Sequence, residues 1–204
     1  MIMNKTRKVF TAIALCVIMI FVTACQKKDN TPFKHGSWSG NTYTSEFFGI
    51  KIQLGADWIA IDDASLAKSV GISDMSESSI RSVFEKGGSI YEMMAAKTNG
   101  SSITISVQDS DQNIALSEKD FFELGIAIIK AQYEALGQKC TVEMGTVMFL
   151  GRSAKCLDIT LTQNGTTVYC ILIPLFRSHY TSCITFGSLS KPDLYSLVAM
   201  ASAL

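Results

Sequence analysis

The sequence predicts an α+β domain in which an antiparallel sheet is sandwiched by helices. Two observations lead to this prediction. Several short segments alternate apolar and polar residues, as half-buried strands do, whereas residues 117–137 place apolar residues at helical spacing. Runs of strands joined by short turns, with helices grouped apart from them, favour helices packed on an antiparallel sheet over a βαβ fold.

The first half of the domain is expected to contain short strands, two short helices and a hairpin. Strands are indicated by apolar side chains at every second position, and helices by a capping residue ahead of an apolar face. Asp62 or Asp63 can cap the first helix, and Asn99-Gly100 is a typical hairpin turn. In chain order we expect strands at 48–54 and 58–61, helices at 62–70 and 77–86, and strands at 90–96 and 102–108.

The second half is expected to contain the longest helix, a four-stranded meander and a closing helix. Ser117 is a good N-cap for the long helix, and Gly137 can end it. Its apolar face, which must cover the sheet, comprises Phe122, Ile126, Ile129, Tyr133 and Leu136, flanked by Phe121, Leu124 and Ile128. Strands are expected at 140–150, 153–162, 167–176 and 180–187, and a helix from Ser190 to Leu204.

The four cysteines within this domain are expected to be free thiols. A disulfide requires Cα atoms within about 7 Å of each other. The strand registers implied by the turns give the cysteines apolar neighbours instead: Val147 for Cys156, Ile159 for Cys170, and Ile173 or Leu172 for Cys183. We therefore expect Cys140, Cys156, Cys170 and Cys183 to pack as small apolar side chains.

The N-terminal segment has the layout of an export signal. Lys5, Arg7 and Lys8 precede an apolar run at 9–22, and polar residues follow Cys25. The run of about 14 residues is shorter than the roughly 20 that a helix needs to cross the hydrocarbon core, so no permanent transmembrane anchor is expected. An ordinary cleaved secretory signal and a short uncleaved anchor are the alternatives.

The stretch Val22-Thr23-Ala24-Cys25 resembles the lipobox of bacterial lipoproteins, with Val22 where Leu is usual. The resemblance implies diacylglycerol on the Cys25 sulfur, removal of the preceding peptide, and acylation of the new N-terminus, for example with palmitate. The chain would then be held on the outer face of the cytoplasmic membrane, or in the outer membrane of a Gram-negative cell. The expected division is a signal peptide at 1–24, a flexible tether at 25–40 that carries a surface His35, and one α+β domain at 41–204.

The domain itself also resembles a known group. The segments YTSEFFGIKIQLGADW and YEMMAAKTNGSSITISVQDS, followed by a long helix, a meander and a closing helix, are similar to the PsbP/Mog1-like fold over roughly residues 41–204. The Pro that usually precedes the Trp is absent, and Gly55 and Ala56 stand in its place. The resemblance implies a binding or assembly factor without a shared catalytic centre, so it assigns no functional residues to this chain.

A polar cluster after residue 108 has the spacing of a calcium-binding loop. Carboxylate and amide oxygens at alternating positions suit a hard cation. The candidate ligands are Asp109, Asp111, Asn113 and Asp120. However, Ile114 replaces the required Gly, Asp120 replaces the final Glu, and a strand precedes the loop where a helix is usual. An Asx-rich turn before a helix cap explains the same residues, so neither a resident metal nor another cofactor is predicted.

Catalysis and nucleic-acid binding find no support in the sequence. No G-x-S-x-G motif occurs, and His179, the only histidine of the predicted domain, is expected to be exposed in a hairpin. Cys183 would lie more than about 13 Å from it along a strand. The chain without its signal carries a net charge of about −3 and no basic run, so it lacks the electrostatic footprint of a nucleic-acid-binding protein.

We therefore expect a non-catalytic binding or assembly module of the cell envelope, attached to the membrane through lipid on Cys25. Its partner would be an envelope protein or a ligand that the sequence does not identify. A solute-binding lipoprotein and an envelope hydrolase are the alternative functions.

Overall fold

A computed structural model describes residues 31–110 and 118–204, and it confirms an α+β fold built on antiparallel sheets. The first half comprises β1 (Ser37–Ser39), β2 (Thr42–Ser45), β3 (Ile50–Gln53), β4 (Ile59–Ala60), α2 (Asp63–Ser69), α3 (Glu77–Phe84), β5 (Ser89–Ala96) and β6 (Ser102–Asp109). The second half comprises α4 (Glu118–Ala135), β7 (Lys139–Phe149), β8 (Arg152–Gln163), β9 (Thr166–Arg177), β10 (Tyr180–Ser188), α5 (Lys191–Val198) and β11 (Ala201–Ala203).

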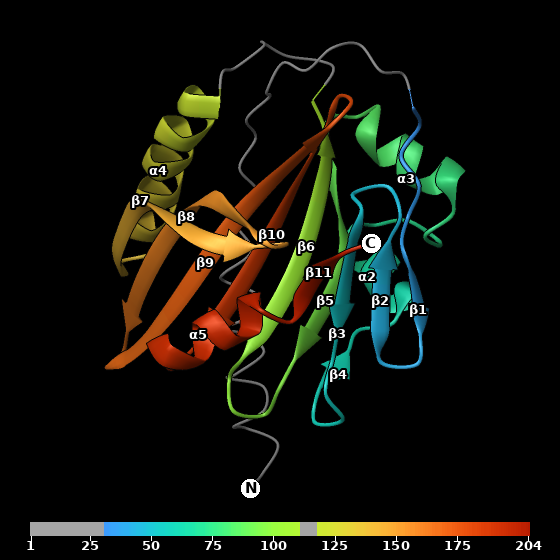
Figure 1. The fold of residues 1–204 in the computed structure, drawn as a ribbon. Helices are drawn as coiled ribbons and strands as arrows, with labels where there is room; N and C mark the ends of the chain where they lie inside the picture. The colour runs from blue at the N-terminus through green and yellow to red at the C-terminus, as the bar shows by residue number, and fades with distance from the viewer. Residues whose placement is uncertain (1–30, 111–117) are drawn as a thin grey trace, which may run out of the picture.

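The strands form one large and one small sheet. The seven-stranded sheet has the order β4-β5-β6-β10-β9-β8-β7, and the four-stranded sheet has the order β1-β2-β3-β11 (Figure 1). β6 and β10 pair although α4 and three strands separate them in sequence, and Tyr180 lies opposite Asp109 in this pair. The pairing therefore places the end of β6 beside the loop that precedes β10.

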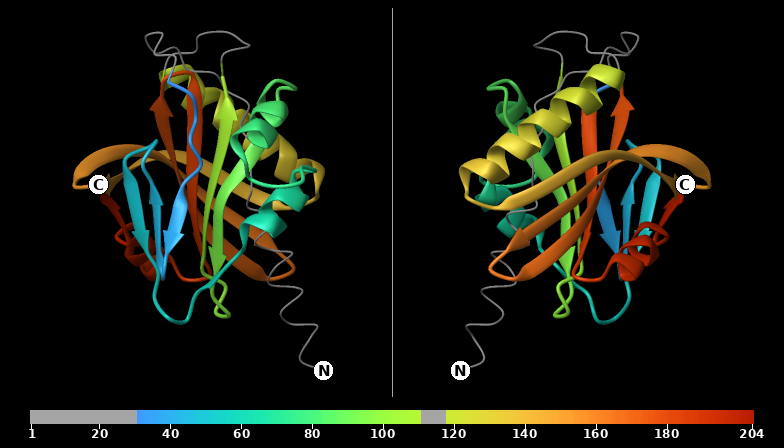
Figure 2. Two further views of the ribbon diagram at one scale, coloured as in Figure 1. Left: turned by 90° about the vertical axis from the view of Figure 1, so that its right-hand side faces the viewer. Right: turned by 90° about the vertical axis from the view of Figure 1, so that its left-hand side faces the viewer.

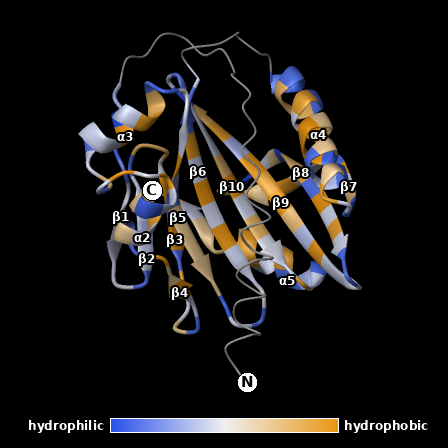
Figure 3. Ribbon diagram, turned by 180° about the vertical axis from the view of Figure 1, so that it is seen from behind, coloured by the Kyte–Doolittle hydropathy of each residue, from blue (hydrophilic) through white to orange (hydrophobic). Residues whose placement is uncertain are grey.

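The large sheet separates two hydrophobic cores. Figure 2 shows α4 and the small sheet on opposite sides of it. On the α4 side, Phe121, Phe122, Ile129 and Tyr133 pack on residues of β7 to β10. On the other side, the small sheet, α3 and α5 pack on β5, β6, β9 and β10. Hydrophobic and hydrophilic residues alternate along β6 (Figure 3), whereas β9 carries four consecutive buried apolar residues, Cys170–Ile173, as expected for a strand that has a hydrophobic core on each side.

Local signals in the sequence correctly predicted several helix ends. The side chain of Asp62 accepts a hydrogen bond from the Ser65 amide at the start of α2, and Ser76 caps α3 in the same way. Ser190 caps α5, with Pro192 in the first turn. The predicted cap of the long helix, Ser117, lies outside the described residues.

The face of α4 is narrower than predicted. Phe122, Ile129 and Tyr133 are buried, but Leu136 is 59% exposed and Leu124 is 41% exposed. Leu136 follows the last helical residue, where Gly137 turns the chain with a φ of 68°, so its side chain lies beyond the sheet contact.

The closing helix is shorter than predicted. It ends at Val198, and Ala201–Ala203 form β11, which pairs with β3. Leu204, predicted to lie on the apolar face of this helix, is 61% exposed. Pairing with the edge of the small sheet satisfies backbone groups that a further helical turn would have satisfied internally, so a tertiary contact decides the conformation of this segment.

The predicted tether at 25–40 is wrong for the ten residues that the structure describes. Phe33 is 5% exposed and belongs to the core, and residues 37–39 form β1 at the edge of the small sheet. Burial of one large aromatic side chain stabilises this segment by roughly 2 kcal/mol, so the folded domain includes Phe33 and β1, ahead of the predicted start at residue 41. The structure does not describe residues 25–30.

The four cysteines of the described domain are free thiols, as predicted. Cys170 lies opposite Ile159, as predicted, but Cys156 lies opposite Gly145 and Cys183 opposite Pro174. The register between β7 and β8 differs from the predicted one because the turn is centred on Leu150 and Gly151, which both have positive φ, and not on Gly151 and Arg152. Such a two-residue turn matches the twist of the strands, and leucine is not a residue that signals it.

Alanine substitutions on α4 should distinguish a buried position from an exposed one by their effect on the free energy of unfolding. We expect Phe122→Ala to lower the free energy of unfolding by about 3–5 kcal/mol, because it opens a cavity between α4 and the sheet. Leu136→Ala should change it by less than about 0.5 kcal/mol. Urea unfolding followed by circular dichroism measures both, and equal losses would contradict the assigned face.

Candidate functional site

A pocket of about 330 Å³ opens where the ends of β6 and β10 meet α3. Three segments far apart in the sequence form it: the chain before β1, one face of α3, and the β6–β10 end of the large sheet (Figure 1). The lining residues are Pro32, Phe33, Glu77, Ile80, Arg81, Phe84, Glu85, Asp109, His179 and Tyr180.

Aromatic side chains form the inner wall of the pocket. Phe33, Phe84 and Tyr180 are each less than 9% exposed. The ring of Phe33 lies 5.8 Å from that of Phe84 and 5.7 Å from that of Tyr180, with Phe47 behind it at 5.3 Å. Rings at these separations support one another and keep a fixed shape, so the wall is preformed.

Charged groups lie around this wall. Arg81 pairs with Glu77 one turn earlier on α3 at 2.9 Å, and Glu85 is exposed one turn later. Across the pocket, His179 Nε2 lies 3.5 Å from Asp109 Oδ2. Three carboxylates against one guanidinium leave the lining with a net charge of −2 when His179 is neutral.

His179 is not the exposed hairpin residue that the sequence predicted. Its side chain is only 23% exposed, and its ring lies on Tyr180 with 4.1 Å between centroids. The hydroxyl of Ser178 lies 3.2 Å from Nδ1 of the same ring, so Ser178, His179 and Asp109 form a row. Ser178 is buried and does not line the pocket, whereas a catalytic serine must reach its substrate. The row therefore positions the imidazole and does not present a nucleophile.

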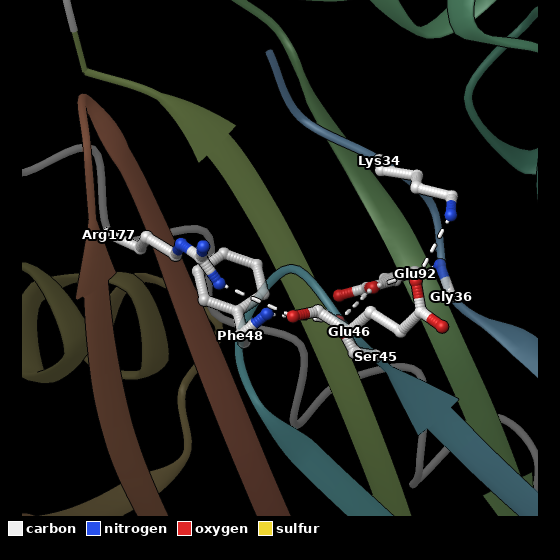
Figure 4. A network of polar contacts seen from close by, with 7 residues as sticks. All are labelled: Lys34, Gly36, Ser45, Glu46, Phe48, Glu92 and Arg177. Atoms are coloured by element: carbon white, nitrogen blue, oxygen red, sulfur yellow. Dashed lines mark hydrogen bonds and ion pairs between the residues drawn. The ribbon is translucent and has the colours of Figure 1, made fainter. Parts of the chain in front are cut away.

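A buried carboxyl group, that of Glu92 on β5, faces the small sheet. Glu92 is fully buried, and Figure 4 shows its side chain among Gly36, Ser45 and Glu46. Its Oε1 accepts hydrogen bonds from the Ser45 hydroxyl at 2.8 Å and from the Gly36 amide at 3.2 Å. Its Oε2 has no hydrogen-bond partner among the described residues. Burial raises the pKa of Glu92 to about 7, although its hydrogen bonds act in the opposite direction.

The backbone comes close to Glu92 because of two local features. A Cβ at position 36 would lie 2.2 Å from the Tyr43 hydroxyl, so only glycine lets the chain pass here. The pairing of β5 with β6 shifts between Tyr91 and Met93, which leaves Glu92 as the extra residue of a bulge. Bulges redirect side chains, and this one directs the carboxyl towards the small sheet.

His35 also lies in this region, although the sequence predicted a surface position. It is half-buried, and its Nε2 has no hydrogen-bond partner among the described residues. Burial lowers its pKa, against smaller opposing effects of Asp63 and nearby backbone groups.

Residues 33–36, here called the strap, therefore connect two features. At one end Phe33 forms part of the pocket wall, and at the other the Gly36 amide binds Glu92. Lys34, between them, pairs with Glu46 at 3.1 Å on the surface (Figure 4). Arg177 holds the same loop by donating to the carbonyl oxygens of Glu46 and Phe47.

Most of the other residues singled out in the sequence are not brought together. Cys25, Asp111 and Asn113 lie outside the described residues, so the lipidation site and the calcium loop are not tested. Asp109 belongs to the pocket, and Asp120 is exposed in the first turn of α4. Within residues 31–110 and 118–204, no group of three His, Cys, Asp or Glu side chains could hold a metal ion.

The Cys183 thiol is not available for chemistry with His179. It packs in the α4 core, and burial raises its pKa to about 12. Asp62 is a helix cap, as predicted.

Sequence reasoning missed Glu92 and Phe33. An acidic residue inside the apolar run Ile90 to Ala96 was the available signal for Glu92, but the pattern does not reveal a bulge. Phe33 is the one large aromatic residue between Cys25 and Trp38, and an isolated aromatic in a polar segment could have marked a docking point.

No protein-family model matches the sequence, and no curated protein matches it. Among solved structures, the chain is similar to cyanobacterial PsbP (CyanoP) from Synechocystis sp. PCC 6803, with a TM-score of 0.48 and 9% identity over 88% of this chain and 98% of that chain. It is also similar to a Pseudomonas aeruginosa protein of unknown function, with a TM-score of 0.35 and 16% identity over 46% of this chain and 61% of that chain. The first is a PsbP, the group that the sequence resembles. At these identities and scores, neither structure assigns a partner, ligand or role to this chain.

Replacing Glu92 should change how stability depends on pH. The pKa of Glu92 is about 7 in the folded chain against an ordinary value of 4.5, so between these values the folded state holds a proton that the unfolded state releases. Stability from this group is complete below about pH 4.5 and is lost as pH rises through 7. The loss amounts to about 3 kcal/mol.

We expect Glu92→Gln to remove this decrease in the free energy of unfolding with rising pH, as measured by urea unfolding between pH 5 and 8. His35 has a lowered pKa and contributes in the opposite direction, but its contribution cancels in the difference between the two proteins. Glu134→Gln, at an exposed position of α4, is the matched control. Parallel curves for wild type and Glu92→Gln would refute the assignment.

Proposed function

We propose that this chain is an exported, lipid-anchored and non-catalytic binding module of the cell envelope, and that the pocket is where it holds its partner. The observation that carries the proposal is the spacing between the predicted anchor and the pocket. Phe33 of the pocket wall follows Cys25 by only eight residues. At about 3.5 Å per extended residue, these residues reach less than about 30 Å.

A chain anchored at Cys25 would therefore keep the pocket close to the membrane. Two lipid chains or more hold a protein firmly, whereas one gives only marginal binding. No helix among residues 31–110 and 118–204 is long and apolar enough to cross a bilayer. The anchoring proposal itself depends on the N-terminal sequence.

The composition of the pocket favours binding over catalysis. None of its lining residues is serine, threonine or cysteine, and its one histidine is held between Asp109 and Ser178. A hydrolase that acts through a serine, threonine or cysteine would need that nucleophile within reach of a bound substrate. Hydrolysis of an ester that Ser178→Ala abolishes would establish the hydrolase instead.

A solute-binding lipoprotein is the second candidate. The pocket volume of about 330 Å³ is at the lower end of the range for small-molecule sites. Such a volume admits one side chain or one small solute. A thermal shift with a free metabolite, absent when Glu85 or His179 is replaced, would favour this alternative.

Replacing Cys25 should release the domain from the membrane without unfolding it. We expect Cys25→Ser to abolish incorporation of a clickable fatty acid and to leave the chain unprocessed or in the soluble fraction. Cys140→Ser, which changes a free thiol in the domain, should keep the label and the membrane fraction. Labelling and cell fractionation measure both, and a labelled Cys25→Ser protein would overturn the anchor.

A further inference from the structure

We propose that the pocket receives a lysine or arginine side chain of a protein at the membrane surface. This inference rests on the proposed binding function and names the chemistry of the partner. It is drawn from the charge, the wall and the size of the pocket.

The charge of the lining selects a cation. Glu77, Glu85 and Asp109 outnumber Arg81, which is the single cationic lining residue apart from His179. Arg81 is already paired with Glu77, and Asp109 lies against His179. Glu85 is exposed at the C-cap of α3 and is the carboxylate best placed to meet an incoming charge. A negative cleft with low-dielectric walls raises the local concentration of cations.

The aromatic wall selects a cation with a long apolar stem. Phe33, Phe84 and Tyr180 are buried lining residues, whereas the charged lining residues Glu77, Arg81 and Glu85 are exposed. Lysine and arginine bury their methylene stems on apolar surfaces and keep the charged group near polar partners. Their cationic groups are also attracted to the faces of aromatic rings within about 6 Å.

The same features disfavour a lipid headgroup. The ammonium group of phosphatidylethanolamine is joined to a phosphate by two carbons, so an anion would follow the cation into the pocket. A lining with a net charge of −2 and one paired guanidinium repels that phosphate. A side chain on a neutral polypeptide brings no such charge.

The test uses the full, lipid-anchored chain in nanodiscs of phosphatidylcholine, which carries no net charge. The probes are acetylated, amidated pentapeptides Gly-Ser-X-Ser-Gly in which X is lysine, arginine, norleucine or glutamate. Binding is followed by saturation-transfer NMR. We expect the lysine and arginine peptides to bind and to weaken as salt is raised, and the norleucine and glutamate peptides to give no comparable signal.

Substitutions then locate the site. Glu85→Gln should weaken the lysine peptide about two- to fivefold, as expected for one exposed ion pair, and Glu85→Lys should weaken it further. Glu134→Gln removes an exposed acid from α4 and should have no effect. Glu85 is exposed, so these variants are expected to fold, and circular dichroism checks this.

Three results would overturn the inference. Equal binding of the norleucine peptide would show a purely apolar pocket, and equal effects of the Glu85 and Glu134 variants would place binding elsewhere. Competition by phosphoethanolamine at the same concentration as the lysine peptide would assign the pocket to a headgroup. Peptide binding is measured in the same way on Cys25→Ser protein, so failure of the anchor and failure of the ligand assignment give different results.

Discussion

The buried carboxyl group of Glu92 is the constraint on which the N-terminal part of the structure depends. It accepts hydrogen bonds from the strap and from β2, while its own backbone belongs to β5 of the large sheet. An ionised carboxylate in such a place is costly unless it is paired with a cation, and the groups that donate hydrogen bonds to Glu92 are the neutral Gly36 amide and Ser45 hydroxyl. The neutral form avoids that cost, so the small sheet and the strap are joined to the large sheet by a group whose charge changes near neutral pH.

The features that the sequence predicted well are those decided within a few residues. Asp62 and Ser190 cap helices through amides three residues away, and Asn164-Gly165 sets the register between β8 and β9. The features that it missed depend on distant partners. Residues 201–203 have no strand signal of their own and become β11 because β3 offers an edge, and Leu150 adopts positive φ because two long strands must meet there.

The candidate site was the least predictable part for the same reason. Asp109 and His179 are 70 residues apart, and only the pairing of β6 with β10 brings them within 3.5 Å. Phe33 lies in a polar segment that looked like a tether, and its burial depends on rings contributed by α3 and β10. Cys25 is the opposite case, since its predicted modification depends on a local motif alone and needs no fold.

The strap links these elements physically. Starting from the predicted anchor, the chain reaches the pocket wall at Phe33 and the buried carboxyl at Gly36 within eleven residues. A ligand that contacts Phe33 therefore contacts the strap, the same segment whose Gly36 amide donates a hydrogen bond to Glu92. If a bound ligand holds the strap more firmly in place, thermodynamic reciprocity requires that a change at Glu92 that loosens the strap weakens ligand binding by the same factor.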